Sequence, residues 1–160
     1  MLVRLARRAA PAALGFLVSV ALGACGSEEA STPAACLGEG RDYLRALEAA
    51  PAAATLDDGT PSGDCLVDGQ EPAALAGVGT SAIEAATRLN ALARRDPAGE
   101  ATVRLGYLVG AVQEAANGTG GIHADLVRRL DAAARFSPGG DPLPASFERA
   151  FGRGYAAGQR

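Results

Sequence analysis

The sequence predicts an all-α domain, a small alanine-rich bundle of four or five helices with one disulfide. Apolar residues make up 48% of the 160-residue chain while aromatic residues reach only 4%, and alanine, which supplies much of the apolar share, is the strongest helix former. Apolar side chains recur at three- and four-residue spacing in several segments after residue 70. The length suits a single domain of this kind.

The first 24 residues have the order of a secretory signal peptide. Residues 1–8 carry three arginines and no acid, and an apolar run follows from Ala9 to Leu22. At 14 residues, this run is shorter than the roughly 20 that a helix needs to cross a bilayer. We therefore expect residues 1–24 to be removed.

The run ends in Leu22-Gly23-Ala24-Cys25, which resembles the lipobox of bacterial lipoproteins. The resemblance implies cleavage after Ala24 and attachment of fatty acyl chains such as palmitate to Cys25, on the extracytoplasmic side of a membrane. An ordinary secretion signal with a coincidental cysteine is the alternative. Residues 25–35 are then the lipidated cysteine and a flexible tether, and residues 36–160 are the helical domain.

Cys36 and Cys65 remain as an even pair in an oxidising compartment, and a disulfide between them is the economical interpretation. Between them, residues 39–50 predict a short helix with Tyr43 on its apolar side. This helix ends near Pro51, because proline cannot continue it. The glycine- and aspartate-rich segment 55–70 predicts turns.

A second helix is expected from Pro72, a residue suited to a first turn. Because Ser81 and Glu84 form a capping-box pattern, Ala82 is the alternative start. The apolar side chains that keep helical spacing here are Leu75, Val78, Ala82, Ala85, Leu89 and Leu92.

Residues 100–116 are nearly all apolar up to Val112, which is typical of a central helix buried on several sides. A buried strand from Thr102 to Val112 is the alternative. Within this segment Gly106 and Gly110 match the G-x-x-x-G pattern, which allows two helices to approach closely. We expect it to mark tight packing inside the bundle.

Two more helices are expected after residue 120. Residues 122–136 have the clearest amphipathic pattern, and residues 145–157 predict a last, glycine-weakened helix. The apolar arc of the first comprises Ile122, Leu126, Val127, Leu130 and Ala133.

Several kinds of chemistry are excluded or disfavoured. All 15 basic residues are arginine, so lysine-dependent catalysis and the P-loop are excluded. Cleavage of the signal peptide leaves 12 arginines against 18 acids, a net charge of −6, which disfavours nucleic-acid binding. His123 is the only histidine, and we interpret it as a hydrogen-bonded residue at a helix start. We expect no catalytic residue, cofactor or metal site, and interpret four loop acids as turn formers: Asp57, Asp58, Asp64 and Asp68.

The leading functional hypothesis is a non-enzymatic interaction or structural module of the cell envelope, held at the membrane by the lipid on Cys25. Its partner would be an envelope protein or a cell-wall component. The candidate partner surface consists of aromatic residues interleaved with arginines: Phe147, Arg149, Phe151, Arg153 and Tyr155. The same rings are alternatively core residues.

Two other hypotheses stay open. One is a lipoprotein that binds a small apolar ligand between helices, in a cavity lined by Leu105, Val109, Leu126 and Leu130. The other is an enzyme acting on envelope substrates, which needs a carboxylate pair or His123 beside a carboxylate in a cleft.

Overall fold

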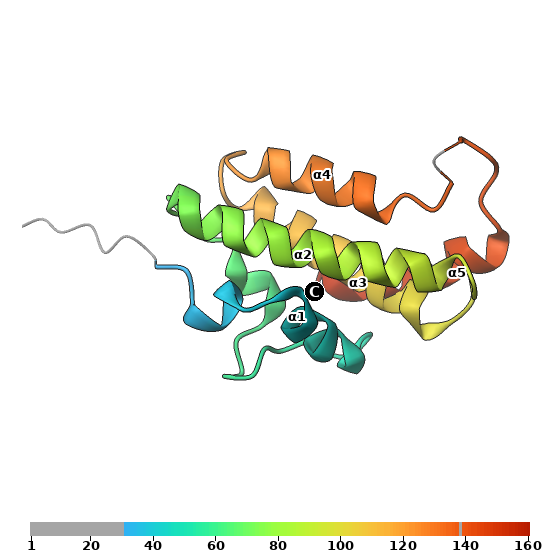
Figure 1. Ribbon diagram of the computed structural model, residues 1–160, viewed down its shortest axis with the longest axis horizontal. Coiled ribbons are helices and arrows are strands. Elements are labelled where there is room, and N and C mark those ends of the chain that lie inside the picture. Colours follow the sequence, from blue (N-terminus) through green and yellow to red (C-terminus); the bar gives the residue numbers. More distant parts are fainter. Residues whose placement is uncertain (1–30, 138) are drawn as a thin grey trace, which may run out of the picture.

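The computed structural model describes residues 31–137 and 139–160, and five α-helices dominate this part (Figure 1). Over these residues no β-strand forms; Thr55 and Pro61 make one isolated bridge. The predicted all-α class is confirmed, and the strand alternative for the central apolar segment is wrong. The signal peptide, the lipobox with Cys25 and tether residues 26–30 lie outside the described residues.

The first helix, α1, spans Gly40–Ala46 and continues as a 3-10 turn, η2, at Leu47–Ala49. Glu39 and Asp42 close its start as a capping box, in which the Glu39 backbone N–H donates to Asp42 Oδ2 at 2.9 Å. Tyr43 and Leu47 are buried. The prediction of a short helix ending before Pro51 is confirmed.

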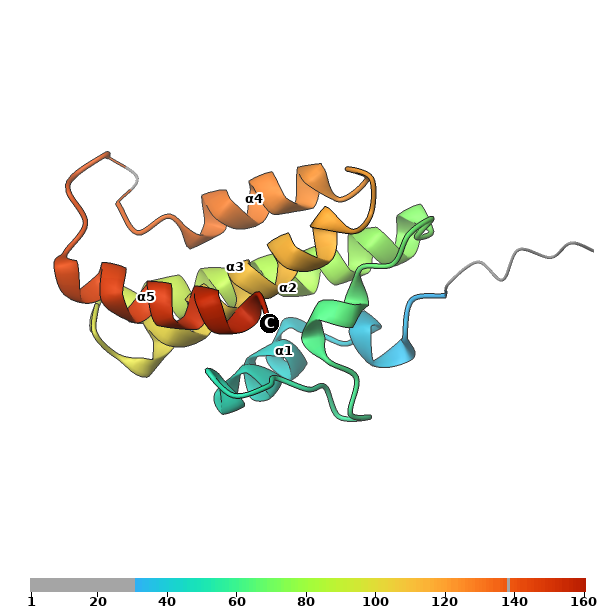
Figure 2. The ribbon, with the colours of Figure 1, turned by 180° about the vertical axis from the view of Figure 1, so that it is seen from behind.

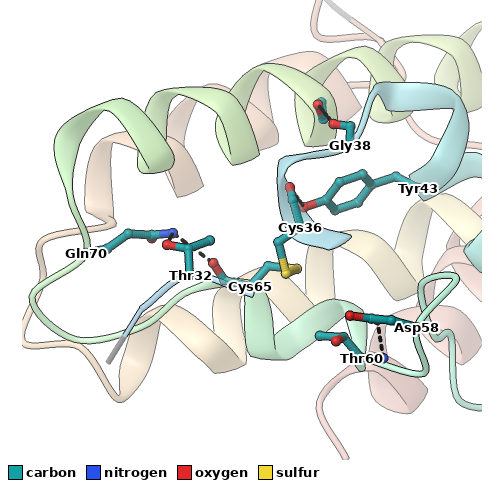
Figure 3. Close-up of a disulfide and its surroundings, with 9 residues drawn as sticks. Thr32, Cys36, Gly38, Tyr43, Asp58, Thr60, Cys65 and Gln70 are labelled. Carbon is teal, nitrogen blue, oxygen red and sulfur yellow. Dashed lines mark hydrogen bonds between the residues drawn. A yellow bond between two sulfur atoms is a disulfide. The ribbon is translucent and has the colours of Figure 1, made fainter. Parts of the chain in front are cut away.

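Two short 3-10 helices, η1 (Ala34–Leu37) and η3 (Ser62–Cys65), carry the cysteines. Cys36 and Cys65 form the predicted disulfide, with an S–S distance of 2.03 Å, and both residues are buried (Figure 3). The Tyr43 hydroxyl donates to the Cys36 carbonyl at 2.9 Å, and its burial raises the pKa of the Tyr43 phenol well above its ordinary value. The disulfide therefore joins η1 to η3, and the Tyr43 hydrogen bond connects η1 to α1.

Helix α2 runs without interruption from Pro72 to Ala93, so the alternative start at Ala82 is wrong. The capping-box residues have other partners. The Ser81 hydroxyl donates to the Gly38 carbonyl at 2.6 Å, and Glu84 accepts from Arg88 one turn later. Leu92, expected on the apolar seam, is 49% exposed, while its neighbour Ala93 is buried.

Helix α3 (Glu100–Asn117) is the central helix, as predicted, and every residue from 105 to 112 is buried. Helix α5 (Ala145–Gly158) lies along it, which Figure 2 shows from behind. Gly106 and Gly110 of α3 lie directly against the backbone of α5. Gly154 and Gly158 of α5 lie in the same way against α3.

At these four glycines the two helices are too close for a side chain. A β-carbon at Gly106 would stand 2.9 Å from the Tyr155 backbone nitrogen, and one at Gly158 would stand 2.7 Å from the Ala111 nitrogen. Ordinary carbon contacts are about 3.5–4.0 Å. The expectation of tight packing at G-x-x-x-G is confirmed, and its partner is a second pair of glycines with the same spacing.

Helix α4 (Ala124–Ala134) packs on α2 and α3 through the buried residues Leu126 and Leu130. It begins two residues later than predicted. Ile122 is 47% exposed rather than in the apolar arc, because Gly120 and Gly121, both with positive φ, hold a turn just before it.

The α4 end that leads into the next loop is fastened to α2. The buried side chain of Asn90 donates to the carbonyls of Ala133 and Arg135, at 2.8 and 3.0 Å, and Arg94 donates to the same Arg135 carbonyl. These bonds satisfy carbonyls that a helix end leaves free. Among the described residues, the buried members of the hydrophobic core lie between Cys36 and Ala157, so the chain from residue 26 onward contains all of them.

Candidate functional site

An apolar groove between α4 and α5 is the main candidate site. Figure 2 shows α3 between α4 and α5, and in Figure 1 the loop that joins α4 to α5 lies at the right-hand end of the molecule. Four aromatic side chains line the groove: Phe136, Phe147, Phe151 and Tyr155. We call it the aromatic groove.

The four rings form a continuous row. Ring centroids are 4.4 Å apart for Phe136 and Phe147, 5.5 Å for Phe147 and Phe151, and 6.2 Å for Phe151 and Tyr155. Phe147 is buried, whereas Phe136, Phe151 and Tyr155 are half-buried. The row therefore packs on the core with one side and faces the groove with the other.

The predicted partner surface is only partly assembled. Phe147, Phe151 and Tyr155 share one side of α5, as their four-residue spacing requires. Arg149 and Arg153 are exposed and are not among the residues lining the groove. An offset of two residues turns about 200° around a helix, so the arginines lie on the other side.

The aromatic groove has a volume of about 700 Å³, within the range of small-molecule sites. Besides the rings, its lining includes Val109 of α3 and Leu143 of the loop between α4 and α5. The cavity expected between Leu105, Leu126 and Leu130 is not where the hollow lies, because these three leucines are buried in the core. Of the residues predicted for that cavity, only Val109 lines the groove.

Charged groups stand at the edge of the aromatic groove. Asp131 of α4, Asp141 of the loop and Glu148 of α5 line it together with Arg135, and all four residues are exposed. The lining thus carries three carboxylates and one guanidinium. The ion pairs formed among the described residues involve none of these four.

A short chain of hydrogen bonds crosses the bundle beside the rings. The Tyr155 hydroxyl donates to Gln113 Oε1 at 2.5 Å, and Gln113 Nε2 donates to Asp131 Oδ1 at 3.0 Å. These bonds join α5, α3 and α4 across the groove. They fix the Tyr155 ring and one oxygen of Asp131.

His123 belongs to a separate, buried polar cluster near the disulfide. Its Nε2 lies 2.9 Å from Gln70 Oε1 and its Nδ1 lies 2.7 Å from Thr119 Oγ1. The Gln70 amide nitrogen donates to the Cys65 carbonyl and to Thr32 Oγ1 (Figure 3). Burial lowers the pKa of His123, and the negative charge of Asp68 partly opposes this.

The predicted role of His123 as a hydrogen-bonded residue at a helix start is confirmed, since it occupies the N-cap position of α4 and has no exposed surface. Asp125, two residues later, pairs with Arg128 instead. Both imidazole nitrogens are occupied by a threonine and a glutamine. Both His123 and Thr119 are buried away from any open site, so the surroundings of His123 are those of a structural residue.

Three of the four loop acids have defined structural partners. Asp68 accepts from the Gly69 backbone N–H at 3.1 Å. Asp57 pairs with Arg45 at 2.8 Å, and Asp58 accepts from the Thr60 backbone N–H at 2.8 Å (Figure 3). Hydrogen bonds from Thr60 hold the pKa of Asp58 below its ordinary value. These contacts agree with their interpretation as turn formers. Over the described residues, no three histidine, cysteine or acidic side chains are grouped as metal ligands would be.

A second hollow, of about 550 Å³, lies where η3, α3 and the end of α5 meet. Its one aromatic residue is Tyr107, whose hydroxyl oxygen already accepts from the Ala54 backbone N–H at 3.1 Å. The rest of its lining consists of alanine, glycine and proline residues and three charged residues, Asp64, Glu114 and Arg160. It offers less apolar area for recognition than the aromatic groove.

The sequence pointed to the rings of α5 but not to the groove. Phe136 lies beyond the end of α4 and joins the row only through the fold. The one sequence signal for a groove was the presence of an aromatic residue on each side of the loop 137–144, Phe136 before it and Phe147 after it.

No helix in the described part of the chain is both long and apolar enough to cross a membrane. No protein-family model, curated protein or solved structure matches this chain.

Proposed function

We propose that this chain is a bacterial extracytoplasmic lipoprotein, anchored through Cys25, whose helical domain is a non-enzymatic binding module of the cell envelope. The N-terminal part of the proposal rests on the order of arginines, apolar run and lipobox in residues 1–25. Two or three acyl chains on Cys25 would hold the domain stably at a membrane, where a single chain would not.

The aromatic groove carries the binding part of the proposal. Three of its four rings, those of Phe136, Phe151 and Tyr155, are only half-buried, although aromatic residues make up just 4% of the chain. Burying such rings against a ligand gains more than burying alanine, because the apolar area removed from water is larger. The volume of the groove favours a small apolar molecule over a protein partner as the occupant.

The place of the groove fits an anchored protein. The described chain begins at one end of the molecule, and the loop that joins α4 to α5 lies at the opposite end (Figures 1 and 2). A domain tethered by its N-terminus can thus hold the aromatic groove away from the membrane surface. The polar groups of His123 are engaged in structural hydrogen bonds, which supports a binding role over catalysis.

The anchor is tested by intact-mass measurement on the membrane fraction of bacteria that produce the wild-type chain or Cys25→Ser. The expected result is a lipid-modified mass beginning at Cys25 in the wild type, lost in the variant. An unmodified wild-type chain in the soluble fraction would remove the anchor from the proposal.

The groove is tested with the oxidised chain from residue 26 onward and N-phenylnaphthylamine, a neutral dye that fluoresces in apolar sites. We expect the wild-type chain to enhance the fluorescence and Phe151→Ser to abolish most of the effect. Leu37→Ser is the matched control, because Leu37 is 52% exposed and does not line the groove. Equal signals from both variants would refute binding in the groove.

A further inference from the structure

The aromatic groove has more carboxylates than guanidinium groups at its edge, so the charge of an apolar ligand should affect how tightly it binds. The lining contains three carboxylates and one guanidinium, which give it a net charge of −2; these groups belong to Asp131, Asp141, Glu148 and Arg135. No ion pair among the described residues neutralises these carboxylates. A ligand that enters the groove therefore meets two kinds of surface. We call the exposed charged residues at its edge the rim, and the row of aromatic rings the floor.

The aromatic rings also favour a positively charged ligand. The faces of aromatic rings attract cations electrostatically, and this attraction grows where water is excluded. Phe151 and Tyr155 are half-buried with stacked rings 6.2 Å apart, so they offer ring surface next to the rim. The Tyr155 hydroxyl donates to Gln113, which turns its hydrogen away from the ligand.

We propose that the aromatic groove binds organic cations, molecules with an apolar body and a positively charged, poorly hydrated group such as a quaternary ammonium. The apolar body fills the space between the rings, and the cation lies near Asp141 and Glu148. Asp131 contributes less, because one of its oxygens already accepts from Gln113. This inference rests on the proposed function, since it names the ligand class of the same groove.

The size of the expected preference follows from the charges. A net charge of −2 at several ångströms, in a site open to water, changes the affinity for a monovalent cation by about tenfold. Dissolved salt screens exposed charges over about 8–10 Å at physiological ionic strength. The preference should therefore shrink to about threefold or less near molar salt.

The experiment uses calorimetric titration of the oxidised chain from residue 26 onward with three probes that share one apolar body: phenylbutyltrimethylammonium, phenylbutanol and phenylbutanesulfonate. The proposal predicts that the cation binds about tenfold more tightly than the alcohol and that the sulfonate binds most weakly. It also predicts that the cation preference falls as salt is added.

Two variants assign the preference to the rim. Asp141→Asn with Glu148→Gln should remove most of the cation preference and leave the binding of phenylbutanol unchanged. Arg135→Gln should strengthen cation binding. Glu71→Gln is the matched control, because Glu71 is an exposed acid at the start of α2 and does not line the groove.

The possible results separate this inference from the proposed function. Equal binding of all three probes, or a cation preference that survives in the double variant, would overturn the cation inference and leave the groove as an apolar site. Absence of binding for all three probes to a chain with native helical circular dichroism would overturn both.

Discussion

Replacing Gly154 by alanine tests the contact between α3 and α5, on which the position of the aromatic row depends. A β-carbon at Gly154 would stand 2.8 Å from both the Tyr107 backbone nitrogen and the Val103 carbonyl carbon. Both atoms belong to the backbone of α3, so no rotation of a side chain relieves the clash. The helices must separate, and the close contacts of the other three glycines are lost as well.

The free energy of unfolding should fall by about 2 kcal/mol. Overpacking a close contact costs about 3 kcal/mol at the upper end of the usual range, and the better helix propensity of alanine returns about 1 kcal/mol. For a domain of this size the melting temperature should drop by about 8 °C.

Gly152 provides a control on the same helix. It is exposed, and a β-carbon there would meet no atom within 4 Å. Gly152→Ala should therefore stabilise the fold by about 0.5–1 kcal/mol through helix propensity alone. The measurement is urea unfolding of the oxidised chain from residue 26 onward, followed by circular dichroism. If Gly154→Ala is as stable as Gly152→Ala, the described approach of α3 and α5 is wrong.

Three further predictions concern the remaining supports of the fold. Burial lowers the pKa of His123 in the folded chain, so as the pH falls this histidine is protonated first in the unfolded chain. The melting temperature should therefore fall as the pH drops below about 6.5. The variant His123→Gln should show a smaller fall of the melting temperature over the same pH range. Replacing Cys36 and Cys65 by alanine should lower the free energy of unfolding by about 3–4 kcal/mol in urea titrations. Asn90→Ala takes the side-chain donor from the Ala133 carbonyl and one of two side-chain donors from the Arg135 carbonyl, so its denaturant midpoint should drop by the equivalent of about 1–3 kcal/mol and dye binding in the groove should weaken.

The helices that could be predicted from the sequence are those whose signals are local. Helix α3 is marked by its apolar composition, and α1 by the position of Pro51. The disulfide followed from counting cysteines. For both helices the deciding information lies within the segment itself.

The sequence predictions that were wrong concern features set by contacts between residues far apart in the chain. The Ser81 pattern resembles a helix start, but its hydroxyl is used by Gly38, 43 residues earlier in the chain. Leu92 fits the spacing of α2 but faces solvent, because the helices that cover α2 pass on its other side. The second pair of glycines, Gly154 and Gly158, was interpreted as a weakness of α5, since sequence alone does not reveal which helix lies against it.

The candidate site shows the same limit. Its rings on α5 were visible as a stripe, whereas Phe136 and the rim carboxylates come from other elements. The grouping of Arg149 and Arg153 with the rings failed on helix geometry alone, because a two-residue offset places them on the other side.

Binding of apolar ligands between α4 and α5 can be observed directly. The most direct test is nuclear Overhauser spectroscopy on the oxidised chain from residue 26 onward, saturated with N-phenylnaphthylamine. We expect contacts from the dye to the rings of Phe136, Phe151 and Tyr155, and none to the exposed side chain of Leu37. Contacts centred on Tyr107, in the smaller hollow at the end of α5, or no contacts to any aromatic ring, would contradict this expectation.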